Sequence, residues 1–148
     1  ICLGLRPSSA AMVAQVDRLA LTTGKDPVPP RKQEWGYRHE PDKFGTAGLT
    51  PEPSITVGPP RVAECPVQLE GVLREWRKFG KNVSANLFEV HITKVHVSEE
   101  LLTGDPARPR IDPSRWRPLI MSFCRFFGLG DEAHPSRLAE SPFMVKAQ

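Results

Sequence analysis

The strongest constraint on the fold of this chain is a proline-rich segment in its first half. Nine of the sixteen prolines of the 148-residue chain lie between Lys25 and Pro66. Proline fixes φ and lacks a backbone N–H, so a continuous helix or a central strand is excluded over this segment. One short helix fits from Pro41 to Ala47, with Gly48 as its end.

A proline-rich stretch is also typical of a disordered linker. Here, however, apolar side chains that could anchor it are spaced along the segment at Trp35, Tyr37, Phe44 and Leu49. Disordered segments carry few such residues, because burial of apolar surface is what offsets the lost chain entropy. The spacing therefore favours an ordered loop laid over another surface.

A helix is predicted before this loop. Ser8 or Ser9 can cap it, and apolar residues from Met12 to Ala20 recur at helical spacing, with Gly24 as the expected stop.

Two strands are predicted after the loop, at Val67–Trp76 and Leu87–Val97, and together they indicate an antiparallel hairpin. In the second strand Phe88, Val90 and Ile92 share one face, which we expect to be buried.

The fold class expected from these elements is α+β or mainly β, in a single domain over residues 1–148, with Leu119–Phe127 as a last strand. Two or three strands of this length do not form an independently stable sheet unless something covers or extends it. We therefore expect further strands to precede Ile1 or to come from another subunit.

Composition excludes several classes of protein. The net charge of +3 is spread along the chain, with no concentrated basic patch of the kind that nucleic-acid binders carry. No apolar run approaches the length of a membrane span and no secretory leader opens the chain, so a cytoplasmic protein is expected. Its three cysteines are far apart and are expected to be reduced.

No metal site is expected either. The four histidines lack ligand spacing, and His91 and His96 are five residues apart on one strand, which predicts side chains on opposite faces. Carboxylates such as Glu64, Glu70 and Glu75 fall singly, so no catalytic residue can be named. The aromatic residues could stack on a flat ligand or simply anchor a core.

Several segments resemble the carboxy-terminal portion of the flavin reductase-like domain family. The similarity runs in order along nearly the whole chain, at Leu19–Pro30, Gly36–Phe44, Ala47–Pro51, Pro59–Glu70, Arg110–Met121, Phe126–Gly130 and His134–Glu140.

This resemblance implies an antiparallel split β-barrel that forms a homodimer and binds FMN, or alternatively FAD. It also implies NAD(P)H as co-substrate, hydride transfer to the flavin and a flavin-dependent monooxygenase as partner. The amino-terminal strands of such a barrel would be missing here, so the barrel is expected to be incomplete, with the helix and the proline-rich loop covering it.

Four flavin-contacting positions follow from the resemblance. Thr22 and Thr23 would donate hydroxyl hydrogen bonds, Lys32 would lie near the phosphate, and Phe127, where the family more often has tyrosine, would contact the ring. Each also has a structural interpretation, as a helix end, a solvated cation or a core residue. Two competing functions remain open: a truncated, non-enzymatic flavin-binding or interaction module, and a split barrel for pyridoxal phosphate or haem.

Overall fold

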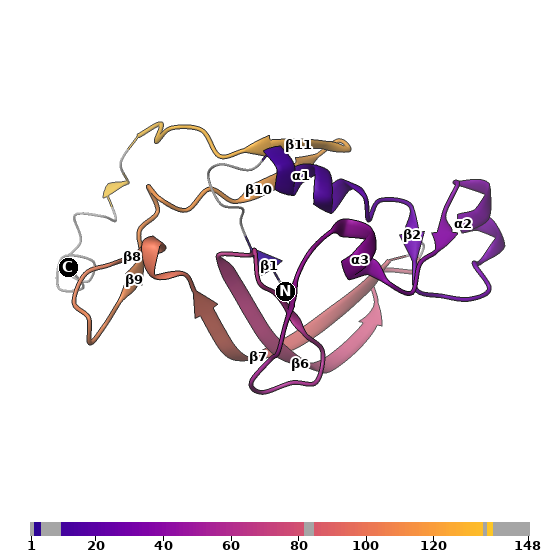
Figure 1. The fold of residues 1–148 in the computed structure, drawn as a ribbon, viewed down its shortest axis with the longest axis horizontal. Helices are drawn as coiled ribbons and strands as arrows, with labels where there is room; N and C mark the ends of the chain where they lie inside the picture. Colours follow the sequence, from indigo (N-terminus) through magenta and orange to yellow (C-terminus); the bar gives the residue numbers. More distant parts are fainter. Residues whose placement is uncertain (1, 4–9, 82–84, 135, 138–148) are drawn as a thin grey trace.

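The computed structural model describes residues 2–3, 10–81, 85–134 and 136–137. It is mainly β, with few and short helices. Figure 1 shows a long curved ribbon of two strands with short elements distributed around it. In chain order the elements are β1 (Cys2–Leu3), α1 (Ala10–Asp17), β2 (Thr22–Thr23), α2 (Pro30–Glu34), β3 (Arg38–His39), α3 (Lys43–Ala47), β4 (Pro51–Glu52), β5 (Arg61–Val62), β6 (Val67–Lys78), β7 (Asn86–Val97), a 3-10 turn (Glu99–Leu101), β8 (Leu102–Thr103), β9 (Arg110–Ile111), β10 (Leu119–Ser122) and β11 (Arg125–Gly128).

The predicted hairpin is confirmed as β6 and β7, the two longest strands. They pair antiparallel, and β1 adds to the other edge of β6 in a three-stranded sheet of order β1-β6-β7. The other strand pairs are short and antiparallel, except that β2 and β3 run parallel. The described strands do not close into a barrel, and further strands before Ile1 remain a prediction.

Two irregularities set which residues of the ribbon share a face. The register shifts between Glu70 and Gly71 and again between Leu73 and Glu75, so each strand carries one extra residue. Cross-strand partners lie on the same side of a sheet, and the pairs after the shifts remain apolar with apolar. The result is one continuous surface, called here the apolar face: Val67, Leu69, Leu73, Trp76, Phe88, Val90, Ile92, Val95 and Val97.

The apolar face is buried only at its base. Val67 is 2% exposed, but Leu73, Trp76 and Phe88 are 55%, 58% and 58% exposed. The prediction that Phe88, Val90 and Ile92 line a buried face is therefore correct about the shared face and wrong about its burial within the described chain. No described element covers the outer half of the ribbon.

The proline-rich segment is folded, as predicted, although not in every detail. Its expected helix is α3, with Asp42 Oδ1 accepting from Gly45 N and Gly48 in the left-handed region at φ 68°. A second helix, α2, was not predicted. Trp35 is 57% exposed and so is not an anchor, whereas Tyr37, Phe44 and Leu49 are half-buried.

The first helix is shorter than predicted. It ends at Asp17, and the left-handed residue that redirects the chain is Leu21, at φ 55°, rather than Gly24. Gln15 Nε2 and Arg18 Nη1 donate to the carbonyls of Gly48 and Ala47, which fasten α1 to α3. The predicted caps Ser8 and Ser9 lie outside the described residues.

The expected last strand is a hairpin. β10 and β11 are joined by Phe123 and Cys124, both with positive φ, as a tight two-residue turn requires. Just before it, Trp116 has its indole Nε1 buried without a hydrogen-bond partner among the described residues.

The expectation of reduced cysteines is wrong for Cys65, which is disulfide-bonded, while Cys124 is free and exposed.

None of the described helices is both long and apolar enough to cross a membrane.

Candidate functional site

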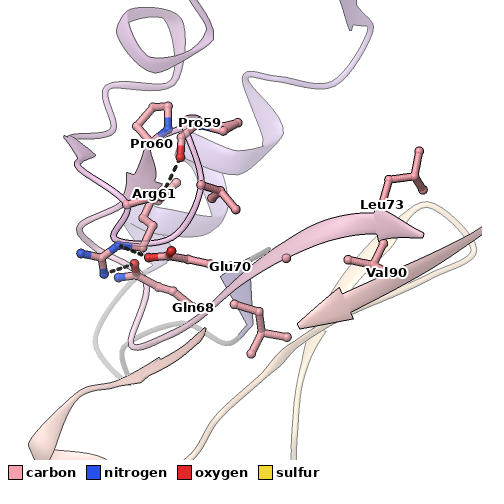
Figure 2. A pocket seen from close by; sticks show the side chains of 12 residues that line it. Pro59, Pro60, Arg61, Gln68, Glu70, Leu73 and Val90 are labelled. Carbon is pink, nitrogen blue, oxygen red and sulfur yellow. Dashed lines mark hydrogen bonds and ion pairs between the residues drawn. The ribbon is translucent and has the colours of Figure 1, made fainter. Parts of the chain in front are cut away.

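The larger of the two pockets described here lies between the end of the proline-rich segment and the start of β6. It has a volume of about 360 Å³, within the range typical of small-molecule sites. Most of the wall is apolar: Val57, Pro59, Pro60, Val62, Leu69, Gly71, Leu73 and Val90. Figure 2 shows Arg61, Gln68 and Glu70 pointing toward one another at one end and Leu73 and Val90 at the other.

Glu70 organises the polar end of this pocket. It is 2% exposed, and its carboxylate accepts hydrogen bonds from Ile55 N at 2.9 Å, Thr56 N at 2.6 Å, Thr56 Oγ1 at 2.6 Å and His96 Nε2 at 2.7 Å. Burial alone would raise the pKa of Glu70. The hydrogen bonds, those from Thr56 and Ile55 foremost, outweigh it and lower that pKa to about 2. Glu70 is therefore an ionised carboxylate that ties the loop to the sheet.

A hydroxyl of β7 extends this contact. Because the Thr56 hydroxyl donates to Glu70, Thr93 Oγ1 is the donor in its 2.6 Å hydrogen bond to Thr56 Oγ1. Thr93 is the extra residue at the first register shift. The irregularity thus turns a polar side chain toward the loop.

Gly71 allows the strands to approach closely beside Glu70. A Cβ atom at this position would lie 2.7 Å from Val90 Cγ1 and 3.0 Å from the His91 carbonyl oxygen. Glycine is the residue that fits such an approach.

Arg61 closes the polar end and uses most of its donors in doing so. Its Nη1 donates to Gln68 Oε1 at 2.8 Å and pairs with Glu52 Oε2 at 3.2 Å, while Nε and Nη2 reach the Pro53 carbonyl. Its Nε also lies 3.5 Å from Glu70 Oε1. This guanidinium is held in place by the protein, so it is not a free cation for gripping a phosphate.

A smaller pocket of about 220 Å³ shares Arg61 and Gln68 with the larger one. Its other lining residues are Glu52, Ala63, Cys65, Pro66, His96, Val97 and Ser98. Among the described residues, no group of three or more side chains could hold a metal ion.

Thr22, Thr23 and Lys32, three of the flavin-contacting residues predicted from the resemblance, lie together away from both pockets. Thr22 Oγ1 donates to the Leu19 carbonyl at 2.7 Å, and the buried Thr23 accepts from Lys25 N at 3.3 Å. Lys32 Nζ lies 5.1 Å from the centre of the Tyr37 ring. In Figure 1, α2 and β2 lie at one end of the molecule.

Phe127, the fourth predicted residue, is on β11, half-exposed and opposite Ile120. Neither pocket includes any of the four among its lining residues. Their roles toward a flavin stay predictions.

Sequence reasoning missed Glu70, Arg61 and His96 as a group. In the sequence Glu70 is a lone carboxylate, although its place on an apolar strand indicates burial with partners. The prediction that His91 and His96 lie on opposite faces is wrong, because the extra residue at Thr93 shifts the alternation: they pair with Val72 and Gln68, which share a face.

Comparison with known proteins supports the fold. No family model matches the chain. The uncharacterized protein YdfE of Bacillus subtilis (strain 168) is 36% identical over 117 residues, covering 79% of this chain and 55% of YdfE. The fold resembles that of nitrilotriacetate monooxygenase component B from Bacillus cereus, with a TM-score of 0.60 over 90% of this chain and 57% of that chain, at 19% identity. The chain therefore spans little more than half the length of each of these two proteins.

Proposed function

We propose that this chain is part of an FMN-binding oxidoreductase of the flavin reductase type, which takes hydride from NAD(P)H and supplies reduced flavin to a monooxygenase. The observation that carries the proposal is the likeness in fold to a monooxygenase component B over 90% of the chain. The segments that resemble flavin reductase-like proteins, Leu19–Pro30 and Pro59–Glu70 among them, point the same way.

The residues around α2 and β2 suit an anionic flavin. Lys32 is a cation beside an aromatic ring, and no described carboxylate pairs with it. The Thr22 and Thr23 hydroxyls lie on the neighbouring strand, and Phe127 would meet the ring. A bound flavin would itself supply the hydride-accepting chemistry, so the protein has to position two rings rather than provide an acid or a base.

The larger pocket lies apart from these four residues, so in this proposal it is a separate place for a flat ring, such as one of the rings of the NAD(P)H co-substrate. Its apolar wall can pack against such a ring, while Glu70 and Arg61 hold the loop that forms this wall. Because these charged groups are already paired with protein partners, they act on a ligand by fixing the pocket.

A homodimer belongs to the same proposal. The outer half of the apolar face exposes Leu73, Trp76 and Phe88, and a surface of this kind is typical of a protein interface. The same observation favours the second candidate function, an interaction module without enzymatic activity.

Titration of the purified chain with FMN, followed by flavin fluorescence quenching, tests flavin binding directly. Lys32→Ala should weaken binding by about tenfold, the cost of one exposed charge-assisted contact. Lys43→Ala, at an exposed position of α3, is the matched control and should bind as the parent does.

NADH oxidation in the presence of FMN, measured above the rate with free flavin, then separates the two candidates. Flavin binding without NADH oxidation would favour the non-enzymatic module. Absence of both would contradict the proposal.

A further inference from the structure

Glu70 fixes the orientation of one histidine. An ionised carboxylate can only accept, so the 2.7 Å contact between His96 Nε2 and Glu70 Oε1 requires the proton on Nε2. In the neutral imidazole, the second nitrogen, Nδ1, then carries a lone pair.

That lone pair is not used by the part of the chain that the structure describes. His96 Nδ1 has no hydrogen-bond partner among the described residues, and it is not one of the atoms cut off from solvent. The His96 side chain is 18% exposed and lines the smaller pocket. His96, with its open acceptor, thus belongs to the lining of a space of about 220 Å³.

The charged side chains paired around His96 are negative in sum. Glu52 and Glu70 contribute two negative charges and Arg61 one positive charge, so the group around a neutral His96 has a net charge of −1. Lys94, opposite Glu70 on β7, is exposed, so solvent screens its charge. A ligand that donates a hydrogen bond is therefore better suited to this surrounding than one that accepts.

We propose that Glu70 and His96 form a proton-accepting pair, in which Glu70 positions the imidazole and His96 Nδ1 accepts a hydrogen bond or a proton from a small N–H or O–H donor in the smaller pocket. In the full transfer, the ligand's N–H or O–H bond breaks, an Nδ1–H bond forms and the conjugate base of the ligand remains. The carboxylate–histidine arrangement resembles those that hold an imidazole in one tautomer elsewhere. It requires no flavin and so goes beyond the proposed function.

The tautomer of His96 is the first test. Nitrogen-15 spectra of the histidine-labelled chain, with His96 assigned from a His96→Gln variant, should show the Nε2–H form favoured by about tenfold or more, as expected for a hydrogen bond to a charged acceptor. Glu70→Gln should bring the two forms closer to equal, and His91→Gln should change nothing. A wild-type His96 with its proton on Nδ1 would overturn the proposal, whether or not the Glu70 variant folds.

The pocket is tested with a pair of probes of the same charge. Methylammonium chloride can donate an N–H to His96 Nδ1, whereas tetramethylammonium chloride cannot. Methylammonium alone should move the Nδ1 resonance in a saturable manner, and the shift should be lost in Glu70→Gln. Equal shifts with both salts, or none with either, would overturn the pocket assignment. Neither result depends on flavin binding, so failure of the flavin titration would leave this test intact.

Discussion

The two halves of the β6–β7 ribbon differ in which side chains they bury: the base buries polar side chains, whereas the outer half exposes apolar ones. At the base, Glu70 and Gln68 are charged or polar and almost fully buried, because the proline-rich loop supplies partners for their atoms. In the outer half, Leu73, Trp76 and Phe88 are apolar and more than half exposed. The base is thus completed within the described chain, whereas the outer half presents a surface suited to a partner.

The largest effect is expected from breaking the base. Glu70→Ala leaves Ile55 N, Thr56 N, His96 and Arg61 without their common acceptor, so the loop should detach from the sheet. We expect Tm to fall by roughly 10 °C. Calorimetry measures this, and Glu75→Ala, an exposed carboxylate on the same strand, is the control. Equal effects of the two substitutions would contradict the special role of the base.

The close approach of the strands beside Glu70 comes next in size. Gly71→Ala should cost about 1–3 kcal/mol in the free energy of unfolding, since the new methyl group would overlap Val90 and the His91 carbonyl. Urea unfolding measures the change. Gly58→Ala, where a Cβ would meet open space, should cost less. A tolerated Gly71→Ala would mean that the strands can separate there at little cost.

Low pH should destabilise the base of the ribbon, where Glu70 lies, and leave the outer half unaffected. The Glu70 carboxyl has an ordinary pKa of 4.5 and a pKa of about 2 in the folded chain, so the unfolded chain binds more protons between these values. The contribution of Glu70 to stability is therefore complete above about pH 4.5 and is lost as the pH falls toward 2. Thermal unfolding across this window should show a fall of several degrees in Tm, reduced in Glu70→Gln. An unchanged slope in that variant would assign the acid sensitivity to other groups.

Substitutions in the outer half should change the free energy of unfolding least and the association of two chains most. Trp76→Lys and Phe88→Lys should change the free energy of unfolding of the monomer by no more than about 0.5 kcal/mol, because both side chains are largely in water. If the apolar face is the dimer interface, sedimentation should show loss of the dimer in both variants. Phe123→Lys, at an exposed turn away from this face, should leave the dimer intact.

The sequence predicts the long ribbon well because alternating apolar residues are a local signal. It does not reveal the extra residues at Thr93 and Arg74, since a bulge depends on which residue of the partner strand lies opposite. Thr93 brings His91 to the face of His96 and its own side chain to the loop, and Arg74 brings Trp76 to the face of Leu73. The site around Glu70 was missed because its members come from the proline-rich loop, β6 and β7, which are separate in sequence and meet only in the folded chain.

Turns without glycine are also not predictable from the sequence. Phe123 and Cys124 adopt positive φ, which their side chains disfavour, so Leu119–Phe127 looked like one strand rather than two. Leu21 takes the place expected for Gly24 at the end of the first helix region in the same way. The short helix before Gly48, by contrast, was predictable because Asp42 and Gly48 both follow local capping rules.

The buried indole nitrogen of Trp116 makes this residue an intrinsic fluorescence probe. Trp35 and Trp76 are more than half exposed, whereas Trp116 Nε1 is shielded. A water-soluble quencher such as iodide should suppress the emission of the two exposed indoles first. The remaining fluorescence would come mainly from Trp116. Its emission wavelength would report on the environment of the region between β9 and β10, separately from the β6–β7 ribbon. Docking of a partner on the apolar face would then be seen as protection of Trp76 from the quencher.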